Sequence, residues 1–167
     1  ACRVRPHTSM LVPEGRAEIT TEGGLDVLGQ ASRMKDVVAR LKAGGMVVSA
    51  FIDPDPAQIE AAQAAGFDVC EVHTGTYAHA FARAGGDMLS PDLRAELDKV
   101  RRAGERIVSL GMRFNAGHAL NYNNVGAVAR MDGVCELHIG HSIVSRAVFT
   151  GLREAVREMK RAMRPEV

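Results

Sequence analysis

The sequence predicts an α/β protein that forms part of a (β/α)8 barrel. Short apolar segments alternate five times with longer amphipathic segments, a pattern typical of βαβ units and a parallel sheet. Polar side chains recur near the ends of the apolar segments. The 167 residues suffice for a single domain, 1–167, whereas a complete barrel needs about 250. We therefore expect an incomplete (β/α)8 TIM barrel.

The first predicted unit joins a strand at 7–13 to a helix at 29–45. Met34, Val38 and Leu41 recur at helical spacing in the second segment, and a pair of glycines ends it. The unit therefore has the order strand, then helix, that a parallel sheet requires.

The second predicted unit joins a strand at 46–53, rich in β-branched residues, to a helix at 55–66. Asp55 is the expected N-cap of that helix, and Pro56 stands at its first position. Three further units follow the same pattern. Their strands and helices are predicted at 67–75, 90–111, 112–118, 123–131, 133–141 and 142–163.

Residues two positions apart on a strand point to the same face of the sheet. In three of the predicted strands, the residues that share a face in this way include polar side chains. The spaced groups are Ser49, Phe51 and Asp53, then Val69, Glu71 and His73, then Glu136 and His138. A doubly wound sheet is usually apolar on both faces, whereas inward polar residues near strand ends suit a barrel with its active site at the carboxyl rim. We expect the missing units of the barrel to precede residue 1.

The composition excludes several classes of function. A net charge of +1, 4% aromatic residues and no Trp give no basis for nucleic-acid binding, and no apolar run approaches the length of a membrane span. Cys2, Cys70 and Cys135 are odd in number and form no CxxC pair, so they are expected to be reduced thiols of a cytoplasmic protein. The last two are expected to be small buried strand residues.

Segment 13–27 is too long for a plain connection between a strand and a helix. It contains Thr20, Thr21 and the pair Gly23-Gly24, whose hydroxyls and backbone amides suit an anion or a sugar hydroxyl. The alternative is an ordinary surface loop with a turn.

Glu71 lies two residues before His73, so both side chains face the same way. A carboxylate inside a barrel is unfavourable unless it is paired or takes part in the chemistry, and burial shifts it towards a useful acid–base range. The alternative is a structural Glu paired with an Arg or Lys. For His73 the favoured interpretation is a wall histidine whose hydrogen bonds are satisfied.

His118 follows Gly117 at the end of a predicted strand, where an imidazole can exchange protons near neutral pH. A structural histidine is the alternative. Further along, Gly140 and His141 lead directly into a helix whose first amides are expected to bind phosphate. Ser142 is alternatively a plain N-cap, which is compatible with phosphate binding.

A metal-dependent hydrolase is a weaker hypothesis. The metal ligands would be Glu71 and four histidines near the strand ends, namely His73, His118, His138 and His141. The sequence, however, has no HxH pair on one strand and no HExxH motif. We therefore expect no metal site.

The stretches LVPEGRAEITTEGGLDV, FIDPDPAQIEAA, EVHTGTYA, NAGHALNYNNV and ELHIGHSIVSRAVFTGLREAVREMKRAM resemble the pyridoxine 5'-phosphate synthase family, in order and from Pro6 onward. The resemblance implies strand–helix units four to eight of a (β/α)8 barrel. It also implies a condensation of 3-amino-2-oxopropyl phosphate with 1-deoxy-D-xylulose 5-phosphate that releases water and inorganic phosphate, without metal or organic cofactor. The implied assembly is a homo-octamer.

By resemblance, Glu71 stabilises the transition state and His118 is the proton donor. The implied substrate-binding residues are Thr20, Ala119, Gly140 and His141. The family usually has Gly at the position of Ala119 and often at that of Ser145. The alternative function is a non-catalytic module that binds sugar phosphate or pairs with another chain.

Overall fold

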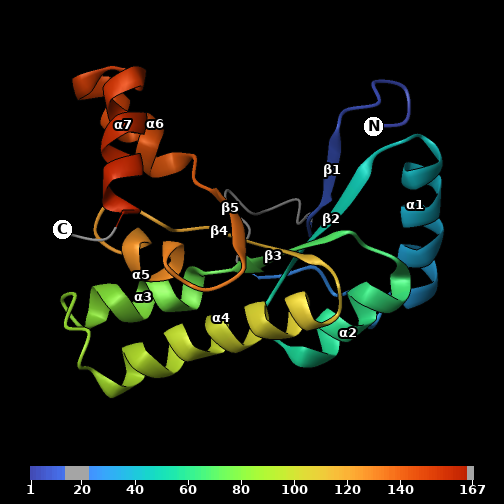
Figure 1. Ribbon diagram of the computed structural model, residues 1–167, viewed down its shortest axis with the longest axis horizontal. Helices are drawn as coiled ribbons and strands as arrows, with labels where there is room; N and C mark the ends of the chain where they lie inside the picture. Colours follow the sequence, from blue (N-terminus) through green and yellow to red (C-terminus); the bar gives the residue numbers. More distant parts are fainter. Residues whose placement is uncertain (14–22, 165–167) are drawn as a thin grey trace.

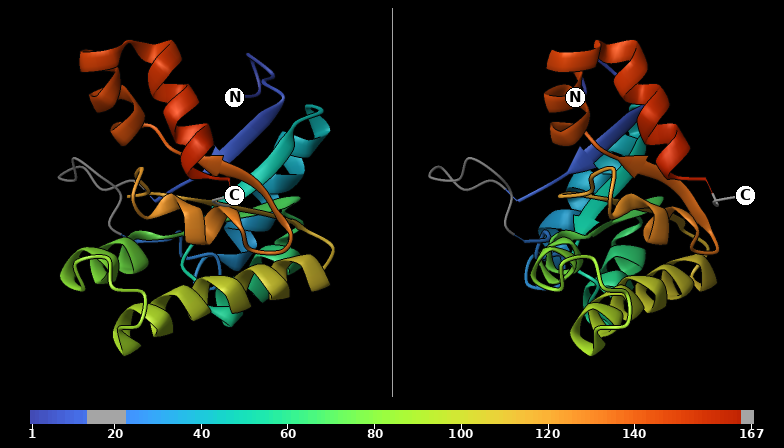
Figure 2. Two further views of the ribbon diagram at one scale, coloured as in Figure 1. Left: turned by 60° about the vertical axis from the view of Figure 1, so that its left-hand side comes forward. Right: turned by 90° about the vertical axis from the view of Figure 1, so that its left-hand side faces the viewer.

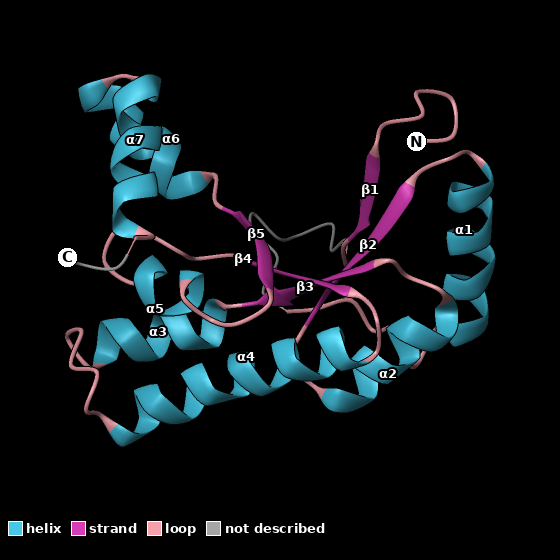
Figure 3. Ribbon diagram, in the orientation of Figure 1, coloured by secondary structure: helices cyan, strands magenta, loops and turns pink. Residues whose placement is uncertain are grey.

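A computed structural model describes residues 1–13 and 23–164, which form one parallel sheet with helices packed against it (Figure 3). The strands are β1 (Thr8–Leu11), β2 (Val47–Ile52), β3 (Val69–His73), β4 (Arg113–Gly117) and β5 (Val134–His138). Each lies within a range that the sequence predicts, so all five predicted strands are confirmed.

The strands lie side by side in the order of the chain, β1-β2-β3-β4-β5, and every neighbouring pair is parallel. A doubly wound sheet reverses its strand order at one point, and this sheet does not. Its strands fan out along an arc, with β1 and β5 at the two edges (Figures 1 and 2). The described residues thus form an open parallel sheet wound in one direction.

Helices flank this sheet along most of its length. They are α1 (Ala31–Ala43), α2 (Pro56–Ala65), α3 (Gly75–Arg83), α4 (Pro91–Ser109), α5 (Val125–Ala129), α6 (His141–Thr150) and α7 (Leu152–Ala162). Helices α1, α2 and α4 lie on the same side of the sheet (Figure 1). There they pack against side chains of one face of the strands, including Val48, Ile52 and Phe114, which are fully buried.

The start of α2 confirms its predicted capping. Asp55 has extended backbone angles, its carboxylate accepts a hydrogen bond from the Ala57 amide at 2.9 Å, and Pro56 opens the helix. This bond satisfies one of the amides that have no partner inside the helix, and Pro has no amide to satisfy.

Two helical assignments from the sequence are corrected. Helix α3 occupies residues for which no helix was expected, since it follows β3 directly and its N-cap, Thr74, makes no side-chain capping bond. The single helix expected at 142–163 is two helices separated by Gly151.

Gly151 has φ +80° and ψ 151°, a backbone conformation that is open only to glycine. Helices α6 and α7 consequently fold back on each other beside β5, as Figure 1 shows, and Arg146 of α6 pairs with Glu158 of α7 at 2.6 Å. The periodicity of the apolar residues continues through this break, which is why the pattern alone indicates one helix.

The cysteines differ in their surroundings. Cys70 of β3 is buried as expected, and burial raises the pKa of its thiol to about 12. The expectation for Cys135 is wrong, because it is exposed on the edge strand β5. An edge strand has no neighbour to cover it on one side.

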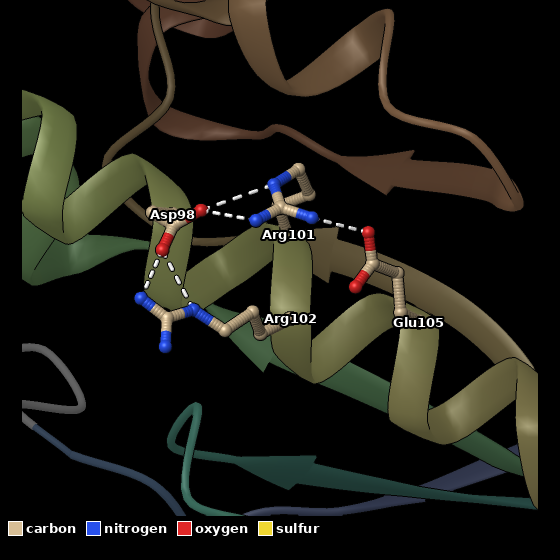
Figure 4. Close-up of polar contacts among 4 residues, drawn as sticks. All are labelled: Asp98, Arg101, Arg102 and Glu105. Atoms are coloured by element: carbon tan, nitrogen blue, oxygen red, sulfur yellow. Dashed lines mark hydrogen bonds and ion pairs between the residues drawn. The ribbon is translucent and has the colours of Figure 1, made fainter.

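The outer surface of α4 carries a chain of ion pairs between residues three and four apart, shown in Figure 4. Asp98 pairs with Arg101 and Arg102, and Arg101 also pairs with Glu105. Pairs at this spacing on an exposed helix stabilise it only weakly, because the surrounding solvent screens the charges. None of the helices within the described residues is long and apolar enough to traverse a lipid bilayer.

Candidate functional site

The carboxyl ends of the strands enclose a cavity of about 580 Å³. Five of the six predicted site residues line it, and the sixth, Thr20, lies outside the described residues. The five are Glu71, His118, Ala119, Gly140 and His141. The predicted residues, which are up to 70 positions apart, therefore meet at one end of the sheet.

A hollow of similar volume, about 620 Å³, lies between α4 and α5 on the outer surface. Its charged lining includes Asp98, Arg101 and Glu105, which already pair with one another. No predicted site residue borders it. The cavity at the strand ends, where parallel α/β sheets bind their ligands, is therefore the candidate site.

The strand register brings the predicted polar face together. Phe51 of β2 is level with Glu71 of β3, which is level with Asn115 of β4, and Asn115 is level with Glu136 of β5. Because side chains alternate along each strand, all four point to the face opposite the helix-packed core. The alternation in the sequence predicted this face for β2, β3 and β5, whereas Asn115 of β4 was not singled out.

Glu71 is buried, and its two oxygens have different neighbours. Oε2 pairs with Nδ1 of His138. Oε1 lies against the Cα of Gly117, where an added Cβ would overlap it and lie 2.9 Å from the His138 carbonyl oxygen. Gly117 therefore makes room for the Glu71 carboxylate. Among the described residues the ion-pair partner of Glu71 is a histidine that lines the same cavity, and not an Arg or Lys.

His118 stands just beyond β4 in the left-handed region, with φ +80°, and Ala119 follows with φ +57°. Thr74 holds this turn: its hydroxyl lies 2.7 Å from the Gly117 carbonyl oxygen and 2.6 Å from that of His118, and can donate to either. Two successive non-glycine residues with positive φ represent backbone strain of the kind that gathers at functional sites. No pattern in the sequence indicated the part played by Thr74.

The pKa of the His118 imidazole is lowered. Partial burial lowers its pKa first, and the positive charges of His73 and His79 lower it further, against the opposing effect of Glu71. At neutral pH the ring is therefore uncharged and can accept a proton.

His73 lies behind His118. Its ring contacts Phe51, with centroids 5.2 Å apart, and its Nδ1 is 2.9 Å from Oδ1 of Asp53. Nε2 is buried and has no hydrogen-bond partner among the described residues. His73 is buried in the wall, but a satisfied wall histidine was expected, and only one of its two ring nitrogens has a hydrogen-bond partner among the described residues.

Helix α6 begins at His141 with Gly140 as its N-cap, and its first helical hydrogen bond runs from the Val144 amide to the Gly140 carbonyl at 2.9 Å. The amides of His141 and Ser142 in the first turn thus have no partner within the helix, and both residues line the cavity. Ser142 is not the N-cap, because its hydroxyl donates to the Leu120 carbonyl at 2.9 Å and ties the helix to the loop after β4. A cavity that joins these amides to Glu71 and His118 can hold an anionic group beside two proton-exchanging side chains.

Among the described residues, no three His, Cys, Asp or Glu side chains gather in a way that could hold a metal ion. The four histidines of the rim instead pair with carboxylates or face the cavity separately.

Comparison with known proteins matches residues 1–165 to a family model described as pyridoxal phosphate biosynthesis protein PdxJ. Proteins named pyridoxine 5'-phosphate synthase are similar to this chain. One from Aromatoleum aromaticum is 66% identical over 98% of this chain and 65% of its own length. One from Azoarcus sp. is 64% identical over 96% of this chain and 65% of its own length. One from Dechloromonas aromatica is 63% identical over 98% of this chain and 65% of its own length.

The chain therefore spans 65% of the length of these curated relatives. The family match runs through the cavity-lining segments of β3, β4 and β5 and through α6. The chain belongs to the PdxJ family of pyridoxal phosphate biosynthesis proteins.

Proposed function

We propose that this chain is part of a pyridoxine 5'-phosphate synthase. The enzyme would join 3-amino-2-oxopropyl phosphate to 1-deoxy-D-xylulose 5-phosphate, with loss of one inorganic phosphate and two waters. The observation that carries the proposal is the meeting of Glu71, His118 and the first turn of α6 at one cavity of about 580 Å³. The relatives that share 63–66% identity bear that name.

The uncharged ring of His118 takes a proton from the bound substrate and returns it to a departing oxygen. Its lowered pKa keeps the ring as a neutral imidazole at neutral pH, which can accept a proton. The imidazolium formed in this way is the acid that the dehydrations need. Such a group contributes roughly 10²–10⁴-fold to the rate.

The carboxylate of Glu71 stabilises positive charge that develops on nitrogen when the amine and the ketone condense. It is buried and fixed by its neighbours, so it need not reorganise during the reaction. The amides at the start of α6, with Gly140 and His141, hold a phosphate group, and Gly140 leaves open space there because no atom lies within 4 Å of an added Cβ. Thr20 and the backbone of Ala119 complete the substrate contacts.

The proposal includes the architecture and the assembly. The open sheet supplies units four to eight of a (β/α)8 barrel, and β1 and β5 are the edges at which the other strands would join. A homo-octamer in the cytoplasm is part of the proposal, and sedimentation velocity of the purified protein tests the octamer.

The decisive experiment measures product formation from the two phosphates with protein expressed from its complete reading frame. Pyridoxine 5'-phosphate and inorganic phosphate are expected in equal amounts, and His118→Gln is expected to lower kcat by about 10²-fold or more. His7→Gln, an exposed histidine before β1, is the matched control and should leave kcat unchanged. Binding of the sugar phosphate without any product would favour the non-catalytic module instead.

A further inference from the structure

His138 lies between two carboxylates that come from different places in the sheet. Its Nδ1 pairs with Oε2 of Glu71 on β3, two strands away in the sheet. Its Nε2 is 3.3 Å from Oε2 of Glu136 on its own strand, β5. Asn115 donates to that same Glu136 oxygen at 3.3 Å and so helps to fix it. Both ring nitrogens of His138 thus face an anionic oxygen.

This arrangement selects one protonation state of the ring. A neutral imidazole has one N–H and one lone pair, so it would direct the lone pair at one of the two carboxylates. Only the imidazolium donates from both nitrogens. The pKa of His138 is raised accordingly, first by the hydrogen bond to Glu71 and then by the charges of Glu71 and Glu136, against the opposing effect of burial.

The pairing matters most for Glu71, whose side chain is only 5% exposed, while that of His138 is 38% exposed. Within residues 1–13 and 23–164, His138 is the sole ion-pair partner of Glu71. A buried carboxylate that loses its only counter-charge is strongly destabilised or takes up a proton. The negative charge at the centre of the cavity therefore depends on the proton carried by His138.

We infer that His138 is a positioning residue of this site: as an imidazolium held between Glu71 and Glu136, it keeps the Glu71 carboxylate ionised and aimed along Gly117 towards the cavity. The inference rests on the proposed function for its catalytic consequence, because Glu71 is the group that meets the developing positive charge. Two titratable groups contact His138, namely Glu71 of β3 and Glu136 of β5. His118 after β4 and His141 of α6 line the same cavity.

The sign of the pH effect follows from the raised pKa. His138 is charged below that pKa and loses its proton as the pH rises through it, so the Glu71 carboxylate loses its partner at alkaline pH. The rate should therefore fall on the alkaline side with the titration of His138. His118 controls the acid side, because its lowered pKa keeps it in the accepting form until the pH falls.

The first test needs no activity. Nitrogen NMR of the histidine rings, in protein expressed from its complete reading frame, is expected to show a titration midpoint of His138 above 6.5, with both ring nitrogens protonated below that midpoint. Glu136→Gln changes an exposed side chain and is expected to move that midpoint down, because one of the two anionic partners is gone. A His138 midpoint at or below 6.5, or a midpoint that Glu136→Gln does not change, would overturn the inference.

The second test compares pH profiles of kcat/KM. His138→Asn keeps a neutral donor near Glu71 and is expected to lower kcat by about 10- to 100-fold, with a smaller change in KM, and to abolish the alkaline limb set by His138. Glu136→Gln should shift that limb to lower pH, while His7→Asn should change neither rate nor profile. An alkaline limb at the wild-type position in His138→Asn would refute the positioning role.

The two tests separate this inference from the proposed function. A wild-type protein that makes no pyridoxine 5'-phosphate defeats the proposed function, and the NMR titration then decides the charge state of His138 by itself. In that case carbon NMR of the Glu71 carboxyl group replaces the rate: its chemical shift is expected to differ between the wild type and His138→Asn, because the ionic partner of the carboxylate is gone. An unchanged shift would overturn the coupling between the two residues.

Discussion

The imidazole rings of His73 and His118 lie with their centroids 4.8 Å apart and their planes tilted by 59°. The first ring is buried in the sheet and bonded to Asp53, and the second stands on the strained turn beyond β4. A positive charge on either ring disfavours a charge on the other, which adds to the effect of burial on His118. His73 is thus part of the reason why His118 is a base at neutral pH.

Titration of His118 is the first prediction. Its ring is expected to titrate below 6.5 in NMR spectra, and His73→Phe, which keeps the ring packing but removes the neighbouring charge, should move the midpoint upwards. Because the folded state binds this proton less tightly than the unfolded chain, the group's contribution to stability is present above 6.5 and is lost as the pH falls through the lower folded value. A midpoint above 6.5 in the wild type would contradict the burial argument.

The second prediction concerns Thr74, which is fully buried beneath the turn. Thr74→Val keeps the shape but removes the hydroxyl from the carbonyls of Gly117 and His118, so the free energy of unfolding should fall by about 1–3 kcal/mol. Urea denaturation measures the change, and kcat should fall with it because the His118 backbone is released. Thr74→Ser keeps the hydroxyl and is expected to retain most of the free energy of unfolding and most of kcat. An equal loss in the Val and Ser variants would refute the hydrogen-bond explanation.

Two glycines of the cavity should respond differently to the same substitution. Gly117→Ala brings a methyl group onto Oε1 of Glu71 and should lower kcat by about 100-fold, because a displacement of about 1 Å at a reacting group has such an effect. Gly140→Ala meets no atom within 4 Å, so it should leave the free energy of unfolding within about 0.5 kcal/mol and raise the KM for the phosphorylated substrates. Steady-state kinetics of both variants provide the check, and a normal kcat for Gly117→Ala would be inconsistent with the packing described.

The strain at Ala119 gives the fourth prediction. Its φ of +57° is unfavourable for a residue with a Cβ, so Ala119→Gly is expected to raise the free energy of unfolding by about 1 kcal/mol. Ala64→Gly, an exposed position inside α2, should lower it by about 0.5–1 kcal/mol, because glycine is unfavourable in a regular helix. Denaturation curves with urea compare the two variants, and a loss of stability in both would show that residue 119 has relaxed out of the left-handed region.

Sequence patterns were sufficient for the elements whose signals are local. The strands follow from apolar segments bounded by turn residues, and the start of α2 follows from Asp55 and Pro56. Helix α3 was not predicted because its start has no capping side chain. The break at Gly151 was not predicted because a glycine inside a periodic segment is compatible with a continuous helix.

The candidate site was predicted in part. Glu71, His118, Ala119, Gly140 and His141 do line one cavity, whereas Thr20 stays a prediction. The sequence placed His138 on the polar face and offered it as one member of a metal cluster, but it indicated no partner for His138 and no role for Thr74. Both act on residues more than 40 positions away, on Glu71 in one case and on the His118 turn in the other.

The sequence by itself determined which residues point into the site, because the period of two along a strand is a property of the chain alone. Only the tertiary structure decided what those residues do to each other. The pair of Glu71 with His138 spans 67 positions and depends on the register of β3, β4 and β5, which is set by packing and backbone hydrogen bonds across the sheet. Charge, burial and hydrogen bonding at the site arise from that register, so no local pattern could contain them.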